Sequence, residues 1–253
     1  MRRFAHLLAV MAMLMTATPL VSQNYGIVFG DLEVTAENAA DIFGDGMASY
    51  DVEGNVLVLR DGFGYNLSHG LVEIHTGNEF HVVLEGNAKF AASISSDDPI
   101  VVETVGDGYL KITSNISGSA LKCKSLTLQP KVFLDLLSRN SQNNMYALDC
   151  EELTVNAAIL HAEVTTAELA VHTSVMNLKE CWLQKPRGGG LNDSYGGICY
   201  ADGLPAKQVR IIVEGFGVEE ILQPEPQVEK VFENGSIVII KDGKKYDITG
   251  REL

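Results

Sequence analysis

The stretches "ALKCKSLTL" (residues 120–128) and "ALDCEELTV" (residues 147–155) decide the fold of this chain. A looser third copy, "AVHTSVMNL", occupies residues 170–178, so the copies recur at spacings of 27 and 23 residues. In each copy, apolar and polar residues alternate, slip by one position, and then alternate again. Because a strand presents every second side chain to the core, the slip indicates two short strands that meet at a corner.

Short strands at this spacing, with no helical periodicity between them, predict a solenoid of stacked parallel β-strands. Each coil then buries its inner face against its neighbours. The stacking predicts two interior ladders, one of Leu121, Leu148 and Val171 and one of Leu126, Leu153 and Met176. A further apolar pair follows each copy: Val132-Phe133, Ile159-Leu160 and Trp182-Leu183. The competing architecture is a β-sandwich, which also uses many short strands.

An earlier part of the chain suggests a second repeat. "VEIHTGNEFHVVLEGN" (residues 72–87) superposes on "IVVETVGDGYLKITSN" (residues 100–115) at a spacing of 28 residues. Each segment has an apolar pair, a polar turn, a second apolar pair and a closing asparagine. We therefore expect these two segments to occupy equivalent places in adjacent coils.

The first residues, "MRRFAHLLAVMAMLMTATPLVSQ", have the three parts of a secretory leader. Arg2 and Arg3 precede an apolar stretch, and a run of small residues follows it. The apolar stretch is too short to span a membrane, which needs roughly 20 residues. We expect cleavage after Ser22 and an extracytoplasmic protein with no transmembrane span.

Without that leader the chain has 17 Lys and Arg against 33 Asp and Glu, a formal charge of −16. Surfaces that bind phosphate need clustered cations, so this balance argues against nucleic acid as a partner. It argues in the same way against anionic lipid and, more weakly, against strongly anionic polysaccharide.

The opening "IVFGDLEVTAENAADIFGDGMASYDVEGNVLVLRDG" (residues 27–62) resembles a recurrent module of secreted or surface right-handed β-helix proteins of the Bacteroidetes type. The shared features are V-T-x-x-N-A, G-D-G, S-Y-D and a turn with N-x-L-x-L. Residues 178–211 are similar to the closing coil of such proteins. The resemblance implies a right-handed parallel β-helix, and some neighbouring families bind carbohydrate. It supplies no catalytic residue, because the matching motifs contain none.

The C-terminal "VEKVFENGSIVIIKDGKKYDITGREL" (residues 228–253) resembles type IX secretion sorting segments of the same organisms. Two short strands are expected on either side of Asp242-Gly243, which suits a tight hairpin turn. The resemblance implies the secretion machinery as a partner, although the segment is shorter than a full sorting domain. The alternative is a structural cap. The chain is thus divided into a leader (1–22), a β-helix domain (23–215), a proline-containing linker (216–227) and a hairpin tail (228–253).

Four cysteines, Cys123, Cys150, Cys181 and Cys199, would lie in an oxidising compartment. Cys123 and Cys150 occupy the same place in adjacent copies, at about the 4.8 Å spacing of neighbouring strands, which is within reach of a disulfide. The alternative for this pair is a ladder of buried thiols.

No catalytic or metal-binding motif is recognised. The histidines His69, His75 and His81 lie six residues apart, and a metal site would need them gathered with a carboxylate. Adjacent carboxylates such as Asp97-Asp98 do not provide the facing pair that glycoside cleavage uses. We therefore expect no catalytic residues, no metal and no cofactor.

Residues 184–203, "QKPRGGGLNDSYGGICYADG", interrupt the repeats and read as a surface loop, where binding residues concentrate. Five side chains there offer hydrogen bonds or an aromatic face to a sugar: Arg187, Asn192, Asp193, Tyr195 and Tyr200. The alternative is that the two tyrosines only cap the last coil.

The expected function is that of a non-catalytic, secreted or surface-displayed binding module, with a glycan or a host surface protein as its partner. One alternative is a polysaccharide-cleaving enzyme on the same fold. That reading requires a groove in which Arg or Lys lies among carboxylates on successive coils. The other alternative is a structural spacer with no ligand.

Overall fold

The computed structural model describes residues 23–115, 118–139, 145–214, 229–233, 236–241 and 244–246. The predicted leader and the predicted linker lie outside the described residues. The chain divides into two compact units between Glu214 and Gly215. Among the described residues, no helix is long and apolar enough to cross a membrane.

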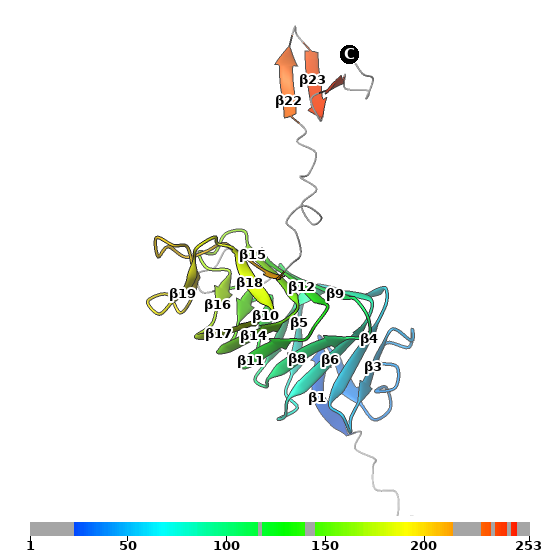
Figure 1. Cartoon of the computed structure of the whole chain (residues 1–253). Coiled ribbons are helices and arrows are strands. Elements are labelled where there is room, and N and C mark those ends of the chain that lie inside the picture. Colours follow the sequence, from blue (N-terminus) through cyan, green and yellow to red (C-terminus); the bar gives the residue numbers. More distant parts are fainter. Residues whose placement is uncertain are drawn as a thin grey trace, which may run out of the picture. The chain divides into compact units, whose positions relative to one another are not determined.

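The described residues form strands and turns (Figure 1). The strands are β1 (Asn24–Phe29), β2 (Leu32–Thr35), β3 (Ala48–Asp51), β4 (Val56–Arg60), β5 (Phe63–Ile74), β6 (Phe80–Glu85), β7 (Asn87–Ser96), β8 (Ile100–Thr104), β9 (Gly108–Ser114), β10 (Leu121–Lys122), β11 (Ser125–Leu128), β12 (Val132–Ser138), β13 (Leu148–Asp149), β14 (Glu152–Asn156), β15 (Ile159–Val164), β16 (Val171–His172), β17 (Val175–Lys179), β18 (Cys181–Lys185), β19 (Gly190–Asn192), β20 (Gly197–Cys199), β21 (Gln208–Val213), β22 (Glu229–Glu233), β23 (Ser236–Lys241) and β24 (Lys244–Tyr246).

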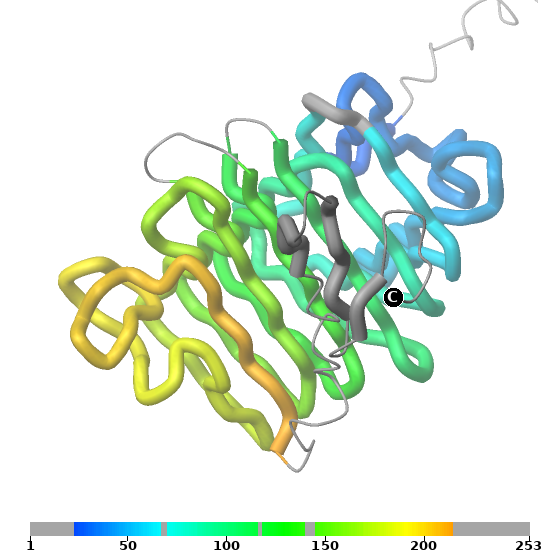
Figure 2. The backbone as a smooth tube through the Cα atoms, turned by 90° about the horizontal axis from the view of Figure 1, so that it is seen from above, coloured from blue at the N-terminus to red at the C-terminus, as the bar shows by residue number. Residues whose placement is uncertain are grey.

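The first unit is a parallel β-helix of about five coils. Figure 2 shows these coils stacked in chain order from blue to yellow, with the orange strand lying back against the last coil. Each coil adds one strand to a seven-stranded sheet, in the order β17-β14-β11-β8-β6-β4-β3. The rest of the coil joins a fourteen-stranded sheet, in which β12 pairs in parallel with β9 and β15. This parallel pairing between successive coils excludes the β-sandwich alternative.

The corners predicted from the repeated slip are confirmed. Each copy of the repeat divides into two strands, β10 and β11, β13 and β14, and β16 and β17, with two residues between them. Both interior ladders form in the predicted register. Leu121 lies beside Leu148 and Leu148 beside Val171, while Leu126 lies beside Leu153 and Leu153 beside Met176.

The superposition of residues 72–87 on residues 100–115 is wrong. Val72 lies in β5 of the fourteen-stranded sheet and pairs with Ile94, whereas Ile100 lies in β8 of the seven-stranded sheet and pairs with Phe80. The match aligned β5 with β8, two strands that precede different corners of the coil. Both places combine an apolar pair with a polar turn, so alternation alone does not distinguish them.

Antiparallel strands close both ends of the β-helix. At the first end, β1 pairs antiparallel with β2 and β5, and β3 pairs antiparallel with β4. At the last end, β21 pairs antiparallel with both β15 and β18. Trp182-Leu183, the apolar pair that follows the third copy, does not pair with Ile159-Leu160, because β21 lies between their strands. Such closure leaves fewer unpaired backbone groups at the open edges of the stack.

The second unit contains one antiparallel sheet, in the order β22-β23-β24. Strands β23 and β24 flank Asp242-Gly243, with Lys241 opposite Lys244, and β22 adds a third strand. The last residues of the sorting-like motif, 247–253, lie outside the described residues.

Candidate functional site

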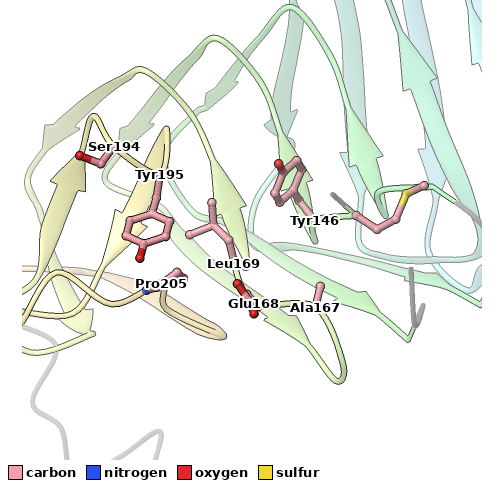
Figure 3. Close-up of a pocket in the computed structure, with 8 residues that line it drawn as sticks. Tyr146, Ala167, Glu168, Leu169, Ser194, Tyr195 and Pro205 are labelled. Atoms are coloured by element: carbon pink, nitrogen blue, oxygen red, sulfur yellow. The ribbon is translucent and has the colours of Figure 1, made fainter. Parts of the chain in front are cut away.

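A pocket of about 380 Å³ lies where the last complete coil meets the closing strands. We call it the tyrosine pocket, and it is lined by Met145, Tyr146, Ala167, Glu168, Leu169, Ser194, Tyr195 and Pro205. Three separate stretches supply these residues: the turn before β13, the turn before β16, and the segments around β20. In Figure 3, Leu169 and Glu168 lie between Tyr195 on one side and Tyr146 on the other.

Tyr195 is presented by the tight turn that joins β19 to β20. The Asn192 side-chain oxygen accepts a hydrogen bond from the Ser194 amide at 2.9 Å. The Asn192 carbonyl accepts from the amides of Tyr195 and Gly196, at 3.2 and 2.9 Å. Asparagine favours such a turn because its side chain bonds to the backbone two residues further on. Tyr195 is thereby positioned with 46% of its surface exposed.

Tyr146 forms the opposite wall and is held by stacking. Its ring lies parallel to that of His172, with centroids 4.7 Å apart and planes 11° apart. The Nδ1 atom of His172 lies 2.7 Å from Asp149 Oδ1, which fixes the histidine ring in turn. Burial and the neighbouring Asp149 raise the pKa of the Tyr146 phenol above its ordinary value, and the protonated phenol can donate a hydrogen bond.

The floor of the pocket is apolar and its rim is polar. Ala167 and Leu169 are buried, whereas Glu168 between them is exposed. Ser194 adds a hydroxyl beside Tyr195. Two aromatic rings and an apolar floor, with a carboxylate at the rim, suit a ligand with one apolar face and several hydroxyls.

The structure brings one of the five predicted residues, Tyr195, into this pocket. Asn192 holds the turn, and Arg187 and Asp193 are exposed without lining the pocket. Tyr200 is 44% exposed but belongs to a different turn, in which its amide donates to the Leu204 carbonyl at 2.8 Å.

Sequence reasoning missed Tyr146 and Glu168. A signal for Tyr146 was present in the repeat. The residue before each aligned alanine is Ser119, Tyr146 or Leu169, so the repeat extended back by one position places Tyr146 beside Leu169. Nothing in the sequence indicated that the turn holding Tyr195 would reach Tyr146 and Leu169, because that contact depends on how the closing strands pair.

A row of charged residues on the fourteen-stranded sheet places a lysine beside a carboxylate on successive coils, which is part of what a polysaccharide-cleaving enzyme on this fold would need. Lys111, Asp135 and His161 lie in register on three successive coils. Asp135 Oδ2 accepts from Lys111 at 2.7 Å and from Tyr109 at 2.9 Å, and Oδ1 lies 2.9 Å from His161 Nδ1. Both carboxylate oxygens are therefore engaged within the protein, and these residues do not line the tyrosine pocket.

Each described histidine side chain lies close to a carboxylate of a neighbouring coil. His75 lies 3.2 Å from Asp97, and His81 lies 3.2 Å from Glu103 and also 3.2 Å from Glu79 of its own coil. Within the described part of the chain, no group of three or more His, Cys, Asp and Glu is arranged to hold a metal ion. The side chain of His69 lies outside the described residues.

A scan against protein-family models, a search of curated proteins and a search of solved structures each find no match for this chain.

Proposed function

We propose that this protein is an extracytoplasmic binding module whose tyrosine pocket takes a sugar residue of a glycan. The observation that supports this proposal is the pairing of Tyr146 and Tyr195 around an apolar floor, with Glu168 at the rim. Sugar rings have an apolar face of C–H groups that packs on aromatic rings, while their hydroxyls bind carboxylates and hydroxyls. The leader-like segment at residues 1–22 and the sorting-like tail support the proposal that the protein is extracytoplasmic.

The charge of the pocket narrows the class of ligand. Among the described residues that line the pocket, Glu168 is the one charged residue, and none is Lys or Arg. A carboxylate repels uronic and sialic acids and attracts an ammonium group. The proposed ligand is therefore a neutral or amino-substituted sugar.

A glycan array with the full chain tests the proposal, followed by titration of the best ligand against two variants. Tyr195→Ala should weaken binding about tenfold, which corresponds to the ~1.4 kcal/mol expected from loss of one aromatic contact. Tyr200→Ala is the matched control, because Tyr200 is almost equally exposed in the same closing region but does not line the pocket. Its affinity should stay within about twofold of the parent.

Two outcomes would contradict this assignment. An array without reproducible binding would overturn the glycan proposal and favour the spacer function. Equal loss in both variants, with unchanged thermal unfolding, would place the binding site outside the tyrosine pocket. Detection of cleaved oligosaccharide would instead support the enzyme hypothesis and direct attention to Lys111, Asp135 and His161.

The role of residues 228–253 in export is a separate proposal based on their resemblance to sorting segments. Deletion of these residues should leave the protein inside the cell envelope if they direct secretion, as measured by immunoblotting of fractionated cells. Unchanged secretion would contradict that role.

A further inference from the structure

A column of four small polar residues occupies one corner of the β-helix. Lys122 pairs with Ser95 on one side and Asp149 on the other, and Asp149 pairs with His172. The next residue of each strand therefore falls in one column: Ser96, Cys123, Cys150 and Thr173. All four are at least 95% buried. The amide of Cys123 donates to the Asp149 carbonyl and that of Cys150 to the His172 carbonyl, both at 3.0 Å.

The outer members of the column bond within their own turns, and Thr173 Oγ1 also reaches the Glu151 carbonyl of the neighbouring coil at 3.2 Å. Ser96 Oγ accepts from the Asp98 amide at 3.0 Å, and Thr173 Oγ1 donates to the Val175 carbonyl at 2.9 Å. The two inner members, Cys123 and Cys150, are neighbours on adjacent coils. The neighbouring Cys150 side chain, together with burial, raises the pKa of the Cys123 thiol.

Cys123 and Cys150 also line a cavity of about 320 Å³, which we call the thiol cavity. Its other lining residues are Ser96, Asp97, Lys122, Lys124, Asp149, Glu151, His172 and Ser174. The remaining cysteines are in different surroundings. Cys181 Sγ donates to the Ala158 carbonyl at 3.3 Å, and Cys199 lies in β20. A small reagent in the thiol cavity would therefore meet Cys123 and Cys150 together.

We propose that Cys123 and Cys150 form a redox-active pair that is closed to an intercoil disulfide by a small organic disulfide. The thiolate of one cysteine attacks a sulfur atom of the reagent, forms a mixed disulfide and releases the first reagent thiol. The second cysteine, as thiolate, then attacks the protein sulfur of that mixed disulfide and releases the second reagent thiol. The protein loses two electrons and two protons, and the reagent is reduced to two thiols.

The geometry of the β-helix favours closure of the pair. Neighbouring parallel strands lie about 4.8 Å apart, inside the range of Cα separations that a disulfide spans. The link would join adjacent coils and stabilise the folded state, chiefly by restricting the unfolded chain. Lys122 and Lys124 line the same cavity and would attract the thiolate during exchange, opposing the repulsion by Asp149 that helps to raise the pKa of Cys123.

The test incubates the reduced, folded full chain with hydroxyethyl disulfide. Intact-mass spectrometry should show the loss of two hydrogen atoms, and proteolysis without reduction should recover one linked pair containing Cys123 and Cys150. The unfolding temperature should rise by roughly 5–10 °C and return after treatment with a reducing phosphine. The double variant Cys181→Ser, Cys199→Ser is the control and should behave like the parent, whereas Cys150→Ser should not close the link.

Three results would overturn the proposal: no change in mass under native conditions, a linked pair that includes Cys181 or Cys199, or a mixed disulfide that persists at one cysteine without closing. The peptide map uses the parent protein, so the test remains decisive even if Cys150→Ser does not fold.

Discussion

The Asp135 carboxylate keeps its negative charge although its side chain is mostly buried. Its side chain is only 11% exposed. Burial by itself would raise the pKa of Asp135, but hydrogen bonds from His161, Lys111 and Tyr109 outweigh burial and hold that pKa well below its ordinary value. Tyr109 responds in the opposite direction, because burial and its hydrogen bond to Asp135 raise the pKa of the phenol. These contacts join three coils through one carboxylate.

Replacement of Asp135 by asparagine should lower the free energy of unfolding by about 2 kcal/mol, since charge-assisted hydrogen bonds are lost while the shape is kept. Urea unfolding measures this loss, with an unchanged dependence on denaturant. Asp149→Asn is the control, because Asp149 accepts from one histidine and its side chain is 25% exposed. Its loss should be under about 1 kcal/mol. Equal losses in the two variants would contradict the special role of Asp135.

The lowered pKa of Asp135 also predicts a dependence on acid. As pH falls below about 4, the unfolded chain takes up a proton at this residue while the folded protein does not. The group therefore stabilises the fold above its ordinary pKa and loses that effect as pH falls, by at most ~1.4 kcal/mol per pH unit. Unfolding free energies measured between pH 5 and 3 should fall more steeply in the parent than in Asp135→Asn. Asp61, whose pKa is lowered by hydrogen bonds from Asn87, contributes to both proteins. Parallel curves would refute the prediction.

At the scale of elements, the hairpin of β19 and β20 determines whether the tyrosine pocket exists. Gly190 pairs with Cys199 and Asn192 with Gly197, and Gly197 in turn pairs with His172 of β16. A Cβ atom on Gly197 would collide with the Val171 carbonyl oxygen and with a methyl group of Leu169. Glycine at this position therefore permits the close approach of β20 to the last coil, which brings Tyr195 to the pocket.

Gly197→Ala should separate β20 from β16, lower the unfolding temperature by a few degrees and weaken sugar binding about tenfold or more. Gly190→Ala provides a control in the same hairpin, because a Cβ atom there meets nothing within 4 Å. The unfolding temperature and the sugar affinity should be nearly unchanged in Gly190→Ala. Calorimetry and the titration used for Tyr195→Ala measure the two effects. A Gly197→Ala protein that binds like the parent would show that the pocket does not require this contact.

At the scale of the whole β-helix, stability comes from each coil covering the next. The interior ladders are fully buried in the inner coils, with Leu126, Leu153 and Leu148 all at 0% exposure, whereas Met176 on the last coil is partly buried. Strands in the middle of the seven-stranded sheet, such as β8 and β11, pair on both sides, whereas β3 and β17 are its two edge strands. In stacked architectures, each repeat depends on its immediate neighbours, so the ends should open first.

Hydrogen exchange should detect this gradient. Amides of β8 and β11 should exchange at least about tenfold more slowly than those of β3 and β17, a difference of ~1.4 kcal/mol in opening free energy. Mass spectrometry of peptic peptides resolves the four strands. Uniform protection across the sheet would indicate that the β-helix opens as one cooperative unit and would contradict the prediction.

The prediction of the fold succeeded where the chain repeats itself and failed where it does not. Leu121, Leu148 and Val171 were placed correctly because each occupies the same position in its copy. Val72 and Ile100 were misplaced because two different corners share one polar pattern. At the candidate site, Tyr195 was identified from its exposed loop, whereas Tyr146 and Glu168 were not, since neither belongs to that loop.

The sequence by itself determined the β-helix, its corners and its interior ladders. A parallel stack repeats one local rule, so a regular spacing of apolar residues is enough to define the register of neighbouring coils. Only the tertiary structure decided the position of β21 between β15 and β18, the convergence of Lys111 and His161 on Asp135, and the meeting of Tyr195 with Tyr146. Some of these contacts involve residues outside the repeat, and others involve outward-facing residues whose partners are not determined by the alternation of apolar and polar residues. In both cases the partners depend on the edges and surfaces that remain once the coils have stacked.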